Sequence, residues 1–144
     1  MPGRKSASTD LVIVATAENW IYAFDANEPR GSENAVVWSN RFGFPVPSLS
    51  FGDGAGDIYR STVGILGTPV IEITKTPNGT KGGTIFAVAW VWKPEEFDDN
   101  PEKAYGHYLI ALDLVTGKPR GRKPRIKIEG DVEGGGYAAA GIYP

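Results

Sequence analysis

Cysteine is absent from the 144 residues, and histidine occurs only once. Without cysteine, the sequence excludes disulfides, thiolate catalysis, zinc fingers and iron–sulfur clusters. The single histidine, His107, excludes a site built from three histidines, and no Gly-x-Ser-x-Gly context accompanies it for a Ser-His-Asp triad. We therefore interpret His107 as a residue at the end of a strand and not as a catalytic base.

Long apolar runs and an excess of one charge are also missing. The first apolar stretch, residues 11–17, is far shorter than the ~20 residues that a membrane-spanning helix needs. The basic residues Arg4 and Lys5 are followed too soon by Asp10 for a signal peptide. The net charge is −2, so no overall field attracts nucleic acid or an anionic membrane. We expect no membrane span, no signal peptide in this chain and no nucleic-acid partner.

Helical periodicity is lacking as well, because no window of ten residues places apolar groups at i, i+3, i+4 and i+7 between breakers. Glycine (19), proline (11) and aromatic residues (four Trp, six Tyr, six Phe) are abundant, which favours short strands joined by tight turns. The sequence therefore predicts an all-β fold. The expected strands are residues 11–16, 20–25, 36–42, 67–73, 84–92, 107–114 and 125–128, with a two-residue hairpin turn at Glu18-Asn19.

Two segments of the chain repeat one another. Residues 21–25 and 109–113 share the pattern apolar, any residue, Ala, aromatic or Leu, Asp, at an offset of 88 residues (111 − 23). The offset exceeds the ~40–50 residues of a compact propeller blade, and we assign the excess to insertions at 43–63 and 93–106. The alanine suits close packing of neighbouring sheets, and the aspartate can accept a hydrogen bond from the N–H two residues on. Gly117 can adopt a positive φ and close a hairpin.

The second copy carries a motif of recognisable type. The pattern Ala-x-Asp-x-x-Thr-Gly-Lys, at Ala111, Asp113, Thr116, Gly117 and Lys118, resembles the repeat of pyrroloquinoline-quinone-dependent dehydrogenases and their non-enzymatic relatives. The run Gly64-Ile65-Leu66-Gly67-Thr68-Pro69-Val70-Ile71 resembles the entry strand of such repeats, and the resemblance covers residues 10–128. In that family a tryptophan after the glycine packs between blades. Trp38 is expected to do so in the first copy, whereas the second copy has Gly121 in that place.

The resemblance implies antiparallel, four-stranded propeller blades. The expected division is a flexible N-terminus at 1–9, three strands of a partial blade at 10–42, a long connection at 43–63, a complete blade at 64–128, and a glycine-rich tail or start of the next blade at 129–144. Propellers close with 4–8 blades. We therefore expect a truncated or split chain, or a ring completed by other copies, with the remaining blades or those copies as partners.

The function that follows is a non-catalytic β-propeller fragment with a structural or protein-interaction role. The alternative is a fragment of a quinone-dependent alcohol or sugar dehydrogenase whose active site lies outside this chain, and whether the chain is an enzyme stays open. In the family, the quinone binds in the central channel of the propeller. This chain has too few blades to enclose such a channel. We expect no catalytic, cofactor-binding or metal-binding residue here, with pyrroloquinoline quinone and calcium confined to a full-length relative. The resemblance also implies a periplasmic or extracellular location.

Four further features have a structural interpretation beside a functional one. Trp90 and Trp92 lie on one face of a strand. We expect them to pack between blades and not to stack on a bound cofactor. The acidic residues Glu95, Glu96, Asp98, Asp99 and Glu102 lack the spacing of an EF-hand, so a solvated loop is expected instead of a calcium site. Asp53 and Asp57 fit either a binding mouth or turns. Asn78-Gly79-Thr80 fits a glycosylation acceptor if the protein is exported from a eukaryotic cell.

The stretch 118–127 holds six basic residues in ten: Lys118, Arg120, Arg122, Lys123, Arg125 and Lys127. Such a run can bind phosphate or polyanions. No aromatic residue lies within it to stack on bases, and charged side chains on an edge strand block unwanted sheet extension. We therefore expect a charged edge strand here.

Overall fold

A computed structural model describes residues 10–29, 31–47, 62–75, 81–93, 104–123 and 125–130. Within these ranges the chain is all-β, as predicted: antiparallel strands form a three-stranded and a six-stranded sheet, and no α-helix is present. One 3-10 turn, η1 (Glu33–Ala35), begins after Ser32, whose hydroxyl accepts a hydrogen bond from the Asn34 N–H. Among these residues no helix has the length and apolar character to cross a membrane.

The smaller sheet is a meander of β1 (Leu11–Ala15), β2 (Trp20–Asp25) and β3 (Val36–Arg41) in that order. Counted from the backbone hydrogen bond between Thr16 and Trp20, its first hairpin has three loop residues, 17–19, and not the two predicted at Glu18-Asn19. The Thr16 N–H donates to the Trp20 carbonyl oxygen at 2.9 Å, and Asn19 has a φ of 61°. A turn followed by one left-handed residue is a common three-residue hairpin loop, and asparagine tolerates the left-handed conformation that it requires.

The larger sheet contains four consecutive strands that form a second antiparallel meander. These are β6 (Val70–Lys75), β7 (Lys81–Trp92), β8 (Tyr105–Asp113) and β9 (Arg125–Lys127). β7 extends three residues further towards the N-terminus than predicted, because these residues pair with the end of β6. β8 extends two residues further, because Tyr105 and Gly106 pair with the end of β7. β9 lies at the edge of the larger sheet, as predicted for residues 125–128, but all three of its residues are exposed, so the expected buried face is not formed.

The predicted connection at residues 43–63 is only partly a connection. Its two ends form β4 (Phe44–Pro47) and β5 (Thr62–Val63), which pair with each other, and β4 also pairs with the end of β7. Val46 and Val63 are buried there. The prolines of β4 led to the prediction of a loop here, because proline is depleted in strands and is tolerated mainly at sheet edges. Residues 48–61 lie outside the described part.

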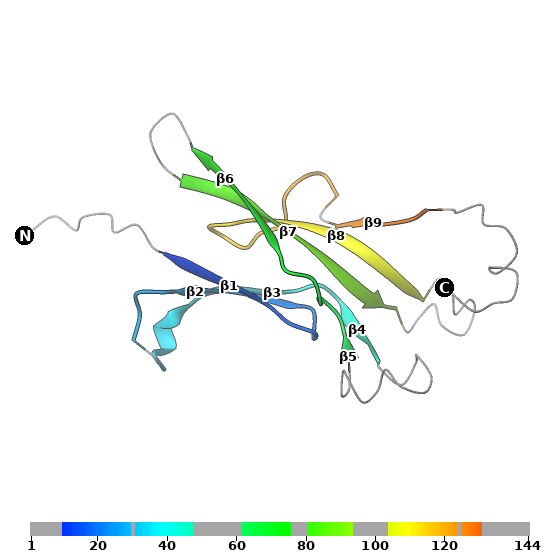
Figure 1. Ribbon diagram of the computed structural model, residues 1–144, viewed down its shortest axis with the longest axis horizontal. Helices are drawn as coiled ribbons and strands as arrows, with labels where there is room; N and C mark the ends of the chain where they lie inside the picture. The colour runs from blue at the N-terminus through cyan, green and yellow to red at the C-terminus, as the bar shows by residue number, and fades with distance from the viewer. Residues whose placement is uncertain are drawn as a thin grey trace, which may run out of the picture.

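The two sheets face each other across one hydrophobic core (Figure 1). Cross-strand neighbours point to the same face of a sheet, and in the larger sheet one such face supplies most of the core. The buried residues of this cluster are Ile21, Phe42, Ile65, Ile85, Ala87, Ala89, Val91, Tyr108, Ile110 and Leu112, with Ile13, Ala15, Trp38 and Leu114 packed against them. The smaller sheet covers this face with its own inner residues, so the two meanders depend on one core.

Candidate functional site at the junction of the two sheets

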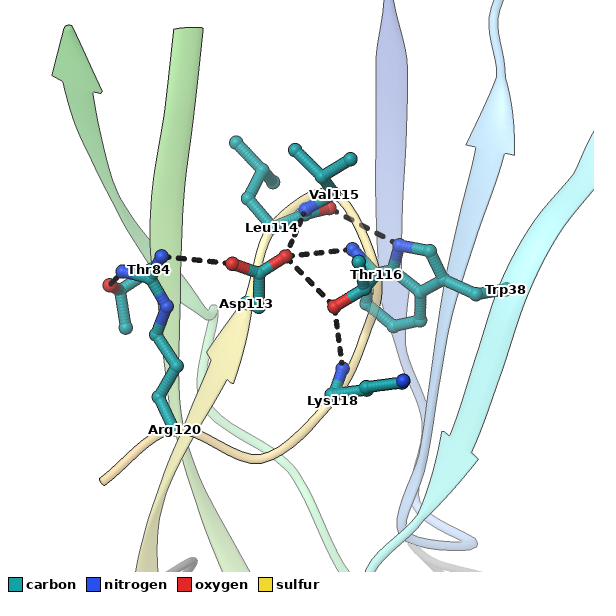
Figure 2. Close-up of polar contacts among 8 residues, drawn as sticks. All are labelled: Trp38, Thr84, Asp113, Leu114, Val115, Thr116, Lys118 and Arg120. Atoms are coloured by element: carbon teal, nitrogen blue, oxygen red, sulfur yellow. Dashed lines mark hydrogen bonds and ion pairs between the residues drawn. The ribbon is translucent and has the colours of Figure 1, made fainter. Parts of the chain in front are cut away.

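The turn after β8 is organised by the carboxylate of Asp113 (Figure 2). Its Oδ1 accepts hydrogen bonds from the N–H groups of Val115 (3.1 Å) and Thr116 (2.8 Å) and from the Thr116 hydroxyl (2.9 Å). The Gly117 N–H donates to the Asp113 carbonyl oxygen at 2.8 Å, and Gly117 has a φ of 68°. The roles predicted for the aspartate and the glycine of the repeat are therefore the ones observed.

The second carboxylate oxygen of Asp113 is bound by Arg120. Arg120 Nη2 lies 2.9 Å from Asp113 Oδ2, and Arg120 Nη1 donates to the hydroxyl of Thr84 at 2.8 Å. Thr84 lies on β7 and is buried. One guanidinium thus joins the end of β8 to β7 and to the chain that follows the turn, as Figure 2 shows.

These contacts set the protonation state of Asp113. Burial opposes ionisation, but the hydrogen bonds from Thr116, Arg120 and the Val115 N–H outweigh it, so the pKa of Asp113 lies below its ordinary value. The group is therefore ionised at neutral pH. Because both of its oxygens are already bound, this carboxylate is suited to holding the turn and poorly suited to taking a proton from a substrate.

The turn also receives a tryptophan from the other sheet. Trp38 Nε1, on β3, donates to the carbonyl oxygen of Leu114 at 3.2 Å (Figure 2). The Trp38 ring lies directly on Gly117, and a Cβ added to Gly117 would be only 2.5 Å from Trp38 Cδ2, too close for any residue but glycine. The Asn40 side-chain amide donates a hydrogen bond to the Gly117 carbonyl oxygen at 3.1 Å. Trp38 therefore packs between the two sheets, and that these sheets are propeller blades stays a prediction.

A buried asparagine joins the sheets at the far end of β2. Asn19 is fully buried, and its side-chain amide donates to the Trp90 carbonyl oxygen at 2.8 Å. The backbone carbonyl oxygen of Asn19 accepts a hydrogen bond from the Phe42 N–H at 2.9 Å. Gly64 approaches so closely that a Cβ there would overlap the Asn19 amide. The turn before β2 is thus held against β7 by the Asn19 amide, whereas Trp38 on β3 holds the smaller sheet against the turn after β8.

The first copy of the repeat contains the matching turn. Asp25 Oδ1 accepts hydrogen bonds from the backbone N–H of Asn27 at 2.9 Å and from its side-chain amide at 3.2 Å. Asp25 and Asp113 therefore have the same role at the ends of β2 and β8, because each side chain accepts a hydrogen bond from the N–H two residues later. A turn centred on the aspartate is therefore common to both copies of the sequence repeat.

Three of the remaining candidate residues lie on one face of the larger sheet, and the others fall outside the described residues. His107 stacks on Trp90 with ring centroids 4.8 Å apart, and both lie on the face of the larger sheet that points away from the core. Trp92 lies on the same face. Whether Trp90 and Trp92 pack between blades stays a prediction. Asp53, Asp57, the acidic residues 95–102 and the triplet 78–80 lie outside the described residues.

Half of the basic stretch has partners within the chain. Arg120 binds Asp113, the Arg125 guanidinium lies 5.3 Å from the Tyr108 ring centroid, and Lys127 Nζ lies 2.6 Å from Glu129 Oε1. That ion pair raises the pKa of Lys127 and lowers the pKa of Glu129. Arg125 and Lys127 belong to the edge strand β9, as the structural interpretation predicts, whereas Arg120 binds the turn after β8.

Chemistry-bearing residues do not converge in the part of the chain described: within it, no three His, Asp or Glu side chains lie close enough to hold a metal ion. What converges instead is a set of contacts between the sheets.

Sequence reasoning identified Asp113, Gly117 and Trp38 but missed Arg120, Thr84, Asn40 and Asn19. Of these, only Asn19 carried a signal, because asparagine in a hairpin turn favours left-handed φ. No family model, no curated protein and no solved structure matches the chain.

Proposed function

We propose that this chain is a non-catalytic part of a β-propeller of the pyrroloquinoline-quinone-repeat type, with a structural or protein-interaction role. In this proposal β6 to β9 form one blade, and β1 to β3 are three strands of the blade before it. The observation that carries it is the contact of Trp38 with Gly117, because it joins one repeat to the turn motif of the next. A tryptophan between consecutive repeats is what the resemblance implies.

The junction itself supports a structural role over a catalytic one. Both oxygens of the Asp113 carboxylate and both Nη atoms of Arg120 are engaged with groups of the same chain. Preorganised and fully satisfied polar networks of this kind rigidify a fold. A general base needs a free lone pair directed at a substrate proton. The contacts around Asp113 hold the turn in place and direct neither carboxylate oxygen at a substrate.

Titration of the chain with pyrroloquinoline quinone in the presence of calcium tests this proposal. We expect no saturable change in quinone absorbance or in tryptophan fluorescence, and no reduction of an electron-acceptor dye with alcohols or sugars. Free tryptophan at the same total indole concentration controls for non-specific stacking of the quinone. Saturable binding with a defined stoichiometry would contradict the proposal and favour the quinoprotein dehydrogenase.

A further inference from the structure

Both sheets expose an apolar face on the side away from the common core. On the larger sheet, cross-strand register places Val70, Phe86, Val88, Trp90, Leu109 and Ile126 on this outer face. Val70 is 65% exposed and Ile126 54% exposed. Exposed apolar faces of this kind mark interaction surfaces in soluble proteins. We call these residues the large outer face.

The smaller sheet has an outer face of similar character. It carries Val12, Val14, Trp20, Tyr22, Phe24 and Val36, again by cross-strand register. Trp20, Tyr22 and Phe24 form a stacked ladder with ring centroids 5.7 Å and 5.8 Å apart, while Val12 is 48% exposed. We call these residues the small outer face. The aromatic ladder offers a large, rigid contact area at low cost in side-chain entropy.

The internal repeat relates the faces of one sheet to those of the other. Ala23 and Ala111 are equivalent positions, yet Ala23 faces the core, whereas Ala111 pairs with Phe86 on the large outer face. The inner face of the smaller sheet therefore corresponds to the large outer face. In the same way, the small outer face corresponds to the inner face of the larger sheet. Val12 occupies the place of Ile85, Tyr22 that of Ile110, and Phe24 that of Leu112.

This correspondence indicates what can cover the large outer face. Within the chain, the Ala23 face is covered by the face that carries Ile85, Ile110 and Leu112. Repeating the same contact on the Ala111 face requires a sheet with a face of that kind, and the small outer face is one. We propose that a second copy of this chain docks its small outer face on the large outer face of the first, head to tail.

The inference deepens the proposed function, since it names the partner and the surfaces through which repeats stack. The contact is heterologous: each copy uses two different faces, so further copies can add and the assembly closes into a ring or grows as a filament. The second repeat has no tryptophan in the place of Trp38. We therefore expect the contact between copies to be reversible, and weaker than the contact between the sheets of one chain.

Charged substitutions on the two faces test this arrangement. Val88→Glu blocks the large outer face, and Val14→Glu blocks the small outer face; both valines are 40% exposed, so neither change disturbs the core. The measurement is the mass of the full chain in solution by sedimentation, from about 1 μM to about 1 mM. We expect the unmodified chain to grow in mass with concentration and each variant alone to remain a monomer.

The mixture of the two variants gives the decisive result. Each retains one intact face, so an equimolar mixture is expected to form a 1:1 heterodimer that grows no further. Leu66→Glu, at an exposed apolar position outside both faces, is expected to assemble like the unmodified chain. Val88→Thr and Val14→Thr, which keep the shape of valine, replace the glutamate variants if circular dichroism shows those to be unfolded.

Three outcomes overturn the proposal of a head-to-tail contact. The unmodified chain could stay monomeric up to the highest concentration, each variant alone could still assemble, or the mixture could fail to form a heterodimer. Variants that still assemble alone indicate a face that pairs with itself, and a monomer indicates that other segments or other proteins cover the faces. None of these results affects quinone binding, so failure here is distinguishable from failure of the proposed function.

Discussion

Asp113 shows how one side chain fixes both the shape of a turn and its dependence on pH. Its carboxylate accepts three hydrogen bonds from the turn and pairs with Arg120, and these contacts hold its pKa below the ordinary value. A group with a lowered pKa in the folded state favours folding when it is ionised. That contribution is present above the pKa of the unfolded chain, near 4, and is lost as the pH falls through the folded pKa.

Asp113→Asn removes the ionisable group and keeps an acceptor oxygen for the turn. We expect it to lower the free energy of unfolding by about 1–3 kcal/mol at pH 7, because hydrogen bonds to a charged group are lost. The difference from the unmodified chain should shrink as the pH falls from 5 to about 3. Urea unfolding at several pH values measures this. A difference that is constant with pH would show that the ionised form makes no special contribution.

Much of the residue-level detail follows from sequence and some does not. Asp113, Gly117 and Trp38 were predictable because a turn aspartate, a left-handed glycine and a docking tryptophan act through their own local chemistry. Arg120 was placed in a charged edge strand, and the sequence contains no sign that its partners are Asp113 and Thr84. That partnership depends on the return of the chain across β8, which local pattern does not encode.

At the scale of elements, the junction joins β3 to the turn after β8. Gly117 is constrained twice there, by its positive φ and by the Trp38 ring on its Cα. Gly31 also has a positive φ, 83°, but a Cβ there meets nothing within 4 Å. The two glycines therefore separate the cost of backbone strain from the cost of losing the contact between the sheets.

Gly31→Ala is expected to cost about 1–2 kcal/mol, the strain of a left-handed alanine. Gly117→Ala should cost the same and a further ~1–3 kcal/mol, because the new methyl group displaces the Trp38 ring. Thermal unfolding of both variants measures the difference. If Trp38→Ala is added, the extra cost should vanish in a double-mutant cycle. Equal effects of the two alanines would show that the ring can move aside freely.

Strand prediction succeeded where apolar alternation was strong, as in β2, β7 and β8. It failed at β4, whose two prolines and short length resemble a loop, although Val46 is fully buried. β4 exists because it extends the sheet at the end of β7, beyond the part that β6 covers. Such a pairing is a property of the assembled sheet, so a window of local sequence could not reveal it.

For the molecule as a whole, the two meanders share one core. Ile21 is fully buried on the smaller sheet and belongs to the same cluster as Ile85, Ile110 and Leu112 of the larger one. The inner face of the smaller sheet is covered by the larger sheet, so separating the two sheets would expose apolar surface of both to water. We therefore expect the sheets to unfold together as one cooperative unit and not as two blades that melt separately.

Ile21→Ala tests this cooperativity from the smaller sheet. Truncation at a fully buried site should cost about 2–5 kcal/mol, whereas Val37→Ala, on the exposed side of β3, should cost less than about 1 kcal/mol. Native-state hydrogen exchange reports where stability is lost. If the core is shared, protection of the amides of β7 and β8 falls by the same free energy as that of β2. Loss confined to β1, β2 and β3 would instead show that the larger sheet is stable alone, and that the junction at Trp38 and Asn19 joins two independent units.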